Sequence, residues 1–565
     1  MTSKKLRQKF LDFFEKKGHK IVPSSSLIPT DPSVLFTTAG MQQFKEYFLG
    51  KESPFGKNVA SCQKCFRTSD IEEVGDNKHL TFLEMLGNFS FGGYFKEEAI
   101  SAACELLNSK LKIQNSKLTF TYFKGDKEVP EDIESKKIWL KLGISENKII
   151  GMSREDNFWG PTGEEGPCGP TTEIYFGGIE LWNLVFNEYY QDKNGKLTPL
   201  KQKGVDTGMG LERLARVVQN KNSVYETDLF KPILEDLRFK IKDLRNERAV
   251  RIIADHIKSS VFLISEGILP SNVERGYILR RILRRAIRYG KMLNLPKNFL
   301  IPLAQKVIGI YKDIYLEIKS QETDILTIIQ NEEEKFEKTL EEGLKHVDRM
   351  LESEMGATGP AAFDIYQTYG FPLEMTEEIV SEKGKKIENR EEFFVLSKKH
   401  QEISRAGVEK KFGGGGEFSP ALHTATHLLH AALRKILGEH VKQMGSDITS
   451  QRLRFDFSHP QKMTPEEIKK VEDLVNQKIK EDLEVKKEEM PYEEAIKSGA
   501  LAFFREKYPE KVTVYSIRST SSGQVFSKEI CAGPHIKRTS ELGHFKILKE
   551  ESSGAGIRRI RAVLE

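Results

Sequence analysis

The chain has 565 residues, of which 38% are hydrophobic and 30% are charged, and its formal net charge is +5. This length allows roughly three or four domains, and no apolar run approaches the roughly 18 residues that a membrane span requires. Only five cysteines occur, which argues against a disulfide scaffold and favours a reducing, cytoplasmic location.

The first part of the chain, residues 1–235, mixes short β-rich runs with helices and Gly-rich turns. Residues 1–18 place Phe and Leu at helical spacing among Lys and acidic residues, which predicts an amphipathic helix rather than a signal peptide. Residues 117–123 predict a strand. Cys62 and Cys65 form an isolated CxxC, which we interpret as two ordinary strand residues rather than a zinc site, because no second pair lies nearby.

The rest of the chain divides into a helical part, a joint and a second mixed part. Residues 236–400 have helical periodicity and include long charged stretches. The Gly-rich run within residues 401–420 predicts a flexible linker. Residues 421–565 then predict a second unit that contains both helices and strands.

A strongly basic helix is predicted over residues 275–291, with apolar residues on one face and cations on the other. The segment holds seven cationic residues and no acid, whereas an ordinary solvated face mixes both signs. The composition favours an exposed surface for nucleic-acid phosphates, and a solvated face without a ligand is the alternative. The arginines of this face are Arg280, Arg281, Arg284, Arg285 and Arg288.

Three pairs of polar and Gly-rich stretches in the first part belong to one predicted nucleotide site. The chain has neither a Walker loop (GxxxxGK[ST]) nor a GxGxxG fingerprint, so ATP bound here requires another scaffold. The pairs are residues 65–70 with 82–91, 156–160 with 166–174, and 182–186 with 205–213.

These stretches resemble those of the alanyl-tRNA synthetases, a branch of the class II aminoacyl-tRNA synthetases. Arg67 with the strand through Phe89 is similar to motif 2 of class II enzymes, and residues 210–213 (Gly-Leu-Glu-Arg) are similar to motif 3. Residues 36–44 match the family's segment that lines the amino-acid pocket. The resemblance implies an α+β multidomain fold: an antiparallel-sheet catalytic domain, a helical tRNA-recognition domain and an α/β editing domain that contains zinc.

The resemblance implies that ATP, with Mg²⁺ on its phosphates, activates L-alanine to alanyl-adenylate, which then charges tRNA(Ala). Both steps depend on positioning and on neutralising phosphate charge more than on a protein nucleophile. Arg67 would bridge the alanine carboxylate and the α-phosphate, and Arg213 would hold the nucleotide. The family's nucleotide-contacting His is Leu80 here, so the neighbouring His79 becomes the candidate. The candidate ATP-binding residues are Arg67, His79, Trp159, Leu181, Trp182, Asn183, Gly210 and Arg213.

The resemblance also implies a small amino-acid pocket in which Asp206 pairs with the alanine ammonium and Asn183 fixes the carboxylate end. For Trp159 and Val185, a plain core position is the alternative interpretation. The candidate alanine-binding residues are Met41, Trp159, Asn183, Val185, Asp206 and Gly208, and the candidate catalytic residues are Arg67, Asp206 and Arg213.

A predicted helix near residue 423 carries three histidines, of which His423 and His427 are spaced i, i+4 so that both rings can hold one ion. His430 lies about 10 Å along the helix axis from His423, so spacing alone permits either 423 with 427 or 427 with 430. A CxxxH follows downstream, and HxxxH with CxxxH can form one zinc site. The order of these motifs in the family's editing domain selects His423, His427, Cys531 and His535, and leaves His430 as a packing residue.

A second site is expected because a pocket that admits alanine cannot exclude glycine by size and rejects serine only weakly. One small group is worth about 1–3 kcal/mol in such a pocket. The resemblance therefore implies that one zinc ion and Gln443 belong to a site that hydrolyses mischarged Ser- or Gly-tRNA(Ala). Four protein ligands indicate a structural zinc, unless a ligand leaves or the coordination expands.

The family reads a G·U pair in the tRNA acceptor stem with an Asn and an Asp. The Asn is present as Asn272, but Gln367 stands where the Asp is expected. Either the pair is read differently, or recognition is relaxed, or the substitution is indifferent.

The sequence ends where an editing domain would end, without the family's usual C-terminal dimerisation region, so we expect a monomer. Two alternatives to a ligase with its own editing site are a trans-acting editing hydrolase without ligase activity and a tRNA-binding protein with inactive sites. The presence of Arg67, Asp206 and Arg213 favours the ligase.

Overall fold

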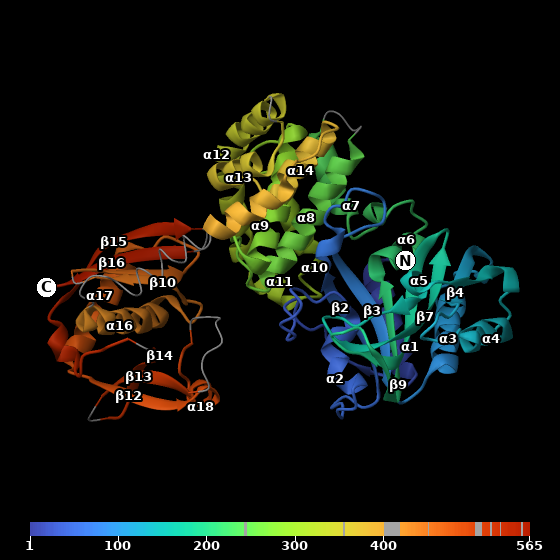
Figure 1. Cartoon of the computed structure of the whole chain (residues 1–565), viewed down its shortest axis with the longest axis horizontal. Helices are drawn as coiled ribbons and strands as arrows, with labels where there is room; N and C mark the ends of the chain where they lie inside the picture. The colour runs from blue at the N-terminus through green and yellow to red at the C-terminus, as the bar shows by residue number, and fades with distance from the viewer. Residues whose placement is uncertain are drawn as a thin grey trace. The chain divides into compact units, whose positions relative to one another are not determined.

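The computed structural model describes residues 1–241, 246–353, 356–400, 419–449, 451–502, 511–519, 522–531, 533–554 and 557–565. Contacts divide the chain into two compact units, residues 1–338 and 339–565 (Figure 1). The predicted linker lies outside the described residues except for its last two positions. Within the described ranges, no helix is both long and apolar enough to cross a membrane.

A large sheet organises the first unit. The strands from β2 to β4 pair antiparallel, whereas the outer strands β1 and β5 run parallel to their neighbours. The order is β1 (Lys20–Ile21), β2 (Asn58–Phe66), β3 (Phe82–Phe91), β9 (Leu197–Gly210), β8 (Ile179–Gln191), β7 (Gly166–Phe176), β4 (Leu118–Phe123) and β5 (Ile149–Met152), with β6 (Phe158–Trp159) paired to β7.

The large sheet is covered on both faces, which explains why β3 is buried along almost its whole length. On one face, Phe10 and Phe14 of α1 (Ser3–Lys16) pack against Trp182, with ring centroids 5.9 and 6.4 Å apart. The same core includes residues of α3 (Lys96–Glu105), α4 (Ile133–Lys141) and α6 (Leu211–Val218). The opposite face is partly covered by η1 (Gly40–Phe44) and α2 (Lys45–Phe48).

A group of helices follows the large sheet in the first unit, and one of them, α8 (Glu247–Ser265), packs against β3. The rings of Phe82 and Phe262 stack 3.7 Å apart, and the buried Lys258 ammonium lies 2.7 Å from the Glu212 carboxylate. One buried ion pair and one aromatic stacking contact therefore tie α8 to α6 and β3. The helices are α7 (Lys231–Lys240), α8 (Glu247–Ser265), α9 (Glu274–Met292), α10 (Leu300–Tyr311) and α11 (Leu316–Ser320), followed by α12 (Glu322–Glu352), which crosses the boundary between the units.

The basic helix forms as predicted, but its arginine face is not an exposed surface. Arg284, Arg285 and Arg288 of α9 are only 5–6% exposed. Arg284 pairs with Glu332 at 2.7 Å, and Arg285 donates to the carbonyl of Ile71 at 2.6 Å. The expectation that these arginines form an open phosphate-binding face is therefore wrong. Their side chains are instead enclosed within the fold.

The other two arginines of the predicted surface are also engaged within the protein. Arg280 donates to Asn272 and to the carbonyl of Pro270, and Arg281 pairs with Glu72. The side chains of both arginines are 11% exposed. The acids that complete this face come from distant parts of the sequence.

The second unit contains the end of α12, the helices α13 (Gly359–Tyr369) and α14 (Leu373–Glu382), and a two-sheet region. One sheet has the order β10 (Gln443–Ile448), β11 (Leu453–Ser458), β16 (Ile557–Leu564) and β15 (Phe545–Gly554). The other has the order β12 (Glu484–Pro491), β13 (Lys511–Arg518) and β14 (Val525–Ile530), with α18 (Tyr492–Lys497) beside it. The two units together confirm the predicted α+β fold.

Helix α16 (Pro420–Leu437) carries the histidines and lies between the two sheets, where it contacts β11, β14 and α17 (Pro465–Lys480) (Figure 1). Ser419 caps its first turn and Pro420 fits the first helical position. Gly438, with φ +116°, ends it. Leu428 and Leu429 face the core with Phe455 and Ile560, so the helix is fixed firmly enough to aim its histidines.

Candidate functional site

The predicted alanine-binding residues on β8 and β9 share one face of the large sheet. Along β9, Asp206, Gly208 and Gly210 alternate to the same side. In register with them on β8, Val185 lies opposite Asp206, and Asn183 lies opposite Gly208. Strand pairing therefore brings together residues that are more than 20 positions apart in sequence.

Asp206 is the most unusual group on this face. Its side chain is 6% exposed, and burial raises the pKa of the carboxyl from 3.8 to about 7. The hydrogen bonds and ion pairs of the described residues include none to this carboxylate. A buried carboxylate without a cation is costly, so its position suits a positively charged ligand.

Asn183 is oriented by Glu173, a residue that the sequence analysis did not single out. The Asn183 Nδ2 donates to Glu173 Oε1 at 2.6 Å, and Tyr175 donates to the other oxygen at 2.6 Å. Burial, and then the nearby Glu180 carboxylate, raise the pKa of Glu173 to about 7. Asn183 Oδ1 is buried and has no hydrogen-bond partner among the described residues. An acidic residue inside an otherwise buried strand was the signal that could have identified Glu173.

The predicted pocket wall is tightly packed. Gly40 of η1 donates its backbone N–H to Met85 Sδ at 3.3 Å, and a Cβ at Gly208 would lie 3.0 Å from the same sulfur. Met41 is buried and accepts at its sulfur from Thr162 Oγ1 at 3.2 Å. Trp159 is half-buried on β6, opposite Gly169 of β7. Glycine at position 208 therefore leaves space that any side chain would fill.

Two arginines, Arg67 of motif 2 and Arg213 of motif 3, lie just after the ends of β2 and β9. Arg67 directly follows β2 and its Nε donates to the carbonyl of Thr38 at 3.2 Å. Arg213 lies on the first turn of α6, and its Nη1 lies 3.0 Å from the Glu180 carboxylate. Both guanidinium groups are only partly buried, so each can exchange its present partner for a phosphate oxygen.

The remaining predicted ATP-binding residues are Trp182, Leu181, His79 and Gly210, and the first three lie away from the Asp206 face. The Trp182 ring packs against α1 on the face opposite to Asp206, so a nucleotide on the Asp206 face would meet its backbone and not the indole. Leu181 is buried in the same core. His79 lies in the loop before β3, where its Nδ1 is 2.7 Å from Asp76. Gly210 has free space beside it, because a Cβ at this position would contact only the Arg213 side chain, at an ordinary distance of 3.8 Å.

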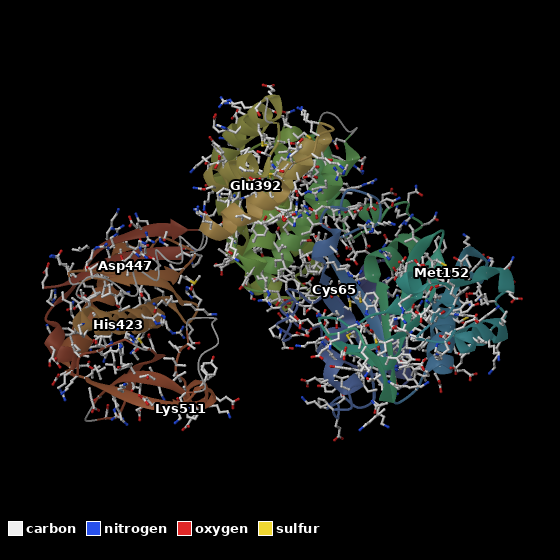
Figure 2. All side chains as sticks on the ribbon, in the orientation of Figure 1. Cys65, Met152, Glu392, His423, Asp447 and Lys511 are labelled. Atoms are coloured by element: carbon white, nitrogen blue, oxygen red, sulfur yellow. The ribbon has the colours of Figure 1, made fainter. Side chains whose placement is uncertain are left out.

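The predicted metal ligands come together in the second unit. His423 and His427 lie on α16, and Cys531 and His535 follow β14; their ligand atoms all lie within 4.8 Å of one another. Cys531 Sγ is 3.4 Å from His423 Nε2. Zinc–ligand bonds of about 2.0–2.3 Å give tetrahedral edges of roughly 3.5 Å, so the donor set fits one zinc ion. Figure 2 shows His423 within this unit.

The Nδ1 atom of each of the three histidines lies close to an oxygen atom. His423 Nδ1 lies 3.2 Å from the carbonyl of Pro534, and His535 Nδ1 lies 3.1 Å from Thr424 Oγ1. His427 Nδ1 lies 3.1 Å from the Glu529 carboxylate. The Nε2 atoms therefore remain for a metal, in the arrangement that second-shell partners impose on histidine ligands.

Burial keeps this cluster neutral and ready to bind a cation. Burial lowers the pKa of His423 to about 4 and that of His535 to about 2, and lowers the pKa of His427 as well. Metal ions bind the neutral imidazole. The three imidazoles are therefore in the neutral form that a metal requires at neutral pH.

Gly533 allows the CxxxH loop to approach α16. A Cβ at this position would lie 2.2 Å from Cε1 of His423, closer than real atoms approach. His430 is not part of the metal cluster, because its Nδ1 lies 2.8 Å from Glu529 and its ring packs near Phe455. Gln443 begins β10, and its Nε2 donates to Ser446 at 3.1 Å.

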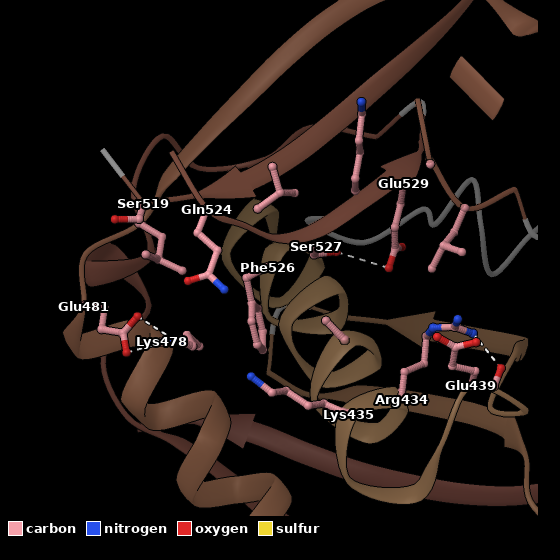
Figure 3. A pocket seen from close by; sticks show the side chains of 16 residues that line it. Arg434, Lys435, Glu439, Lys478, Glu481, Ser519, Gln524, Phe526, Ser527 and Glu529 are labelled. Atoms are coloured by element: carbon pink, nitrogen blue, oxygen red, sulfur yellow. Dashed lines mark hydrogen bonds and ion pairs between the residues drawn. The ribbon is translucent and has the colours of Figure 1, made fainter. Parts of the chain in front are cut away.

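A cavity of about 470 Å³ lies in the second unit (Figure 3). Charged residues from α16 and α17, including Arg434, Lys435 and Lys478, line it together with β14. None of the four candidate ligands lines it, but Glu529 does. Glu529 therefore contacts both the cavity and the metal cluster.

The candidate tRNA-reading residues are both exposed. Asn272 lies just before α9 and accepts a hydrogen bond from Arg280. Gln367 lies on α13. Each amide is accessible to a large ligand.

Comparison with known proteins gives two family matches and close full-length relatives. The family described as "tRNA synthetases class II (A)" matches residues 5–431, and "Threonyl and Alanyl tRNA synthetase second additional domain" matches residues 512–561. A protein of Borrelia hermsii named Alanine–tRNA ligase is 47% identical over 600 residues, covering 100% of both chains. Proteins with the same name from Treponema denticola and a Thermotoga species are 48% and 40% identical; each alignment covers 100% of this chain, and 99% and 80% of the relative.

Proposed function

The chain belongs to the alanine–tRNA ligases, a family of ATP-dependent class II aminoacyl-tRNA synthetases, and we propose that it charges tRNA(Ala) at the Asp206 face of the large sheet. The observation that carries the assignment of the site is Asp206 itself. A buried carboxylate with no partner among the described residues, beside glycines and an amide whose oxygen is buried, suits the ammonium of a small amino acid.

In the first step, a carboxylate oxygen of alanine attacks the α-phosphorus of ATP, and pyrophosphate leaves. Asp206 holds the ammonium, and Arg67 lies between the carboxylate and the α-phosphate, where its charge offsets the negative charge of the transition state. Arg213 holds the phosphate or adenine end of ATP in place of its present contact with Glu180. Mg²⁺ arrives as part of the nucleotide substrate.

Alanine is further confined by the residues around Asp206. Met41, Trp159 and Val185 form the wall, and the space above Gly208 accepts the methyl group. Asn183 presents its amide to the same pocket, with Glu173 behind it. In the second step, a terminal ribose hydroxyl of the tRNA attacks the carbonyl of the adenylate and AMP leaves, a transfer that relies on positioning.

The second unit is proposed to hydrolyse Ser- or Gly-tRNA(Ala). His423, His427, Cys531 and His535 would hold one zinc ion, which when bound organises the site and supplies a Lewis acid. His423 and His427 are aimed by α16, and the CxxxH loop closes the set. Gln443 is proposed to line the pocket for the misattached amino acid.

Recognition of tRNA is assigned to Asn272 and Gln367, which would read the acceptor stem through exposed amides. Every residue proposed for the ligase site lies in one unit of one chain, so charging does not require a second copy, and we propose a monomer. The Cys531 thiolate would persist in a reducing compartment, which supports a cytoplasmic location.

Alanine-dependent ATP–pyrophosphate exchange tests the proposed function most directly. We expect exchange with alanine, weaker exchange with serine and glycine, and charging of tRNA(Ala). The alternative is a trans-acting editing hydrolase, which would deacylate Ser-tRNA(Ala) without catalysing exchange. Absence of alanine-dependent exchange in a folded, zinc-loaded protein would reject the ligase in favour of that hydrolase.

A further inference from the structure

The Glu529 carboxylate lies close to two histidines at once, one of which is a candidate metal ligand. Its Oε2 lies 3.1 Å from His427 Nδ1, and its Oε1 lies 2.8 Å from His430 Nδ1. Ser527 Oγ donates to Oε1 at 3.3 Å. The carboxylate is thus placed behind the cluster, on the side away from the Nε2 atoms.

From this arrangement we infer that Glu529 is a positioning residue of the metal centre, with His430 as its second anchor. The inference rests on the proposed zinc site. The Glu529 carboxylate lies against Nδ1 of His427, which favours the tautomer that carries its proton on Nδ1 and leaves Nε2 for a metal. His430 and Ser527 hold the carboxylate itself in place.

The three histidines of the cluster are not held equivalently. His423 meets a backbone carbonyl and His535 meets a threonine hydroxyl, so both have neutral partners. His427 instead has its Nδ1 beside a carboxylate oxygen, at 3.1 Å. A zinc ion with one thiolate and three neutral imidazoles carries a net charge of +1, and the Glu529 carboxylate cancels it inside the protein.

This charge balance explains why a carboxylate is buried at this position. Glu529 is 3% exposed, and a buried unpaired carboxylate is strongly unfavourable. His430 and the Ser527 hydroxyl hydrogen-bond to its Oε1, His427 Nδ1 lies 3.1 Å from its Oε2, and the nearby metal would balance its charge. The same geometry gives His430, which the metal set excludes, a specific role in place of simple packing.

The main test compares zinc affinity of the full chain and of Glu529→Gln, measured by competition with a chromophoric chelator. A Gln amide has a single acceptor oxygen and cannot accept from both histidines, so we expect zinc affinity to fall about 10–100-fold. Glu550→Gln is the matched control, because Glu550 has a side chain 2% exposed in the same unit but pairs with Arg558. The control should keep the affinity of the unaltered chain.

A second readout separates positioning from general stability. Co²⁺ replaces zinc and its visible spectrum reports the ligand geometry, so we expect an altered or weakened spectrum in Glu529→Gln only. The melting temperatures of the metal-free proteins should differ little, whereas the increase that zinc gives should shrink in this variant. If Glu529→Gln does not fold, His430→Phe, which keeps an aromatic ring near Phe455, should still weaken zinc binding, by a smaller factor.

The outcomes distinguish this inference from the proposed metal site. Zinc affinity and a Co²⁺ spectrum equal to those of the unaltered chain in Glu529→Gln would overturn the role of Glu529 while leaving the site intact. An unaltered chain that binds no zinc would overturn the site and the inference with it. Equal loss in Glu529→Gln and Glu550→Gln would show a general effect of stability and would also overturn the inference.

Discussion

Replacing Asp206 by Asn should make the first unit more stable and at the same time nearly inactive. The pKa of this carboxyl is raised from 3.8 to about 7 by burial. A pKa difference of about 3 between the folded and unfolded states corresponds to about 4 kcal/mol, at 1.36 kcal/mol for each pKa unit. Above pH 7, burial of the charged carboxylate therefore lowers the free energy of unfolding by about 4 kcal/mol. An Asn side chain has the same shape without the charge, so it removes this cost. A buried amide without a partner has its own cost of about 1–3 kcal/mol, which offsets part of the gain in stability.

The pH dependence gives a cleaner measure than the absolute value. For a carboxyl whose pKa is raised on folding, the unfolded state ionises first, so the native protein loses stability as pH rises from about 4 to 7 and then levels off. The cost is about 1.6 kcal/mol at pH 5 and about 4 kcal/mol at pH 8. Relative to the unaltered chain, Asp206→Asn should therefore gain about 2–3 kcal/mol of unfolding free energy between these pH values, whatever the amide costs.

The assay is built into the chain, because Trp139, Trp159 and Trp182 are its only tryptophans and all lie in the first unit. Denaturant unfolding followed by tryptophan fluorescence at pH 5 and pH 8 therefore reports on this unit alone. ATP–pyrophosphate exchange measures function. Loss of one partner of a buried charge pair costs about 3–5 kcal/mol, so kcat/KM for alanine should fall about 100- to 1,000-fold or more.

Asp255→Asn is the matched control. Asp255 is also fully buried, but its carboxylate accepts from the Thr81 N–H at 3.0 Å and from the Thr81 hydroxyl at 2.5 Å. This variant should lose stability at both pH values. The reasoning would be refuted if Asp206→Asn kept kcat/KM within tenfold, or if its stability relative to the unaltered chain did not rise between pH 5 and pH 8.

Three further predictions concern the second unit. Cys531→Ala should lower bound zinc and deacylation of Ser-tRNA while largely sparing alanine-dependent exchange, and unchanged zinc content would contradict the ligand set. Gly533→Ala removes no ligand, but its methyl carbon would lie 2.2 Å from a ring carbon of His423. We therefore expect zinc affinity to fall about tenfold or more. Normal zinc content would show that the loop can shift. Charging of tRNA variants with G·C in place of the wobble pair should be poorer than charging of G·U tRNA, and Gln367→Asp should widen the gap; equal charging of both by the unaltered chain would mean that recognition is relaxed.

The metal cluster could be predicted from the sequence because its information is local. His423 and His427 are one helical turn apart, and any stable helix through residues 420–437 brings them to one face. Cys531 and His535 form a similarly short motif. Only the contact between the HxxxH pair and the CxxxH pair depends on residues far apart in the sequence. Because few side chains in the chain can bind zinc, few other pairs could take part in that contact.

The basic helix shows where the same reasoning stops. Periodicity correctly grouped its arginines on one face of α9. It contained no information on what covers that face, since Glu332 lies 48 residues after Arg284 and Ile71 lies 214 residues before Arg285. A cationic face without acids of its own is equally suited to binding phosphate and to receiving acids from distant elements.

Glu173 and Glu529 were missed for a related reason. Each becomes meaningful only through a partner on another strand or helix: Asn183 of β8 for the first, and His427 of α16 for the second. Strand register decides the first pairing, and a shift by one residue would turn Glu173 to the other face. Residues that orient a functional side chain are therefore harder to predict than residues that contact a ligand.

The geometry of the pocket also explains why this chain combines two sites. Its strongest predicted interaction, between Asp206 and an ammonium, involves a group that glycine, alanine and serine all share, so it contributes affinity without selectivity. Discrimination rests on the space above Gly208, where one small group is worth about 1–3 kcal/mol. Making the Asp206 pair stronger would tighten binding of all three amino acids equally. Selectivity beyond that limit must come from a separate hydrolytic step, which is the role proposed for the unit that carries His423 and Cys531.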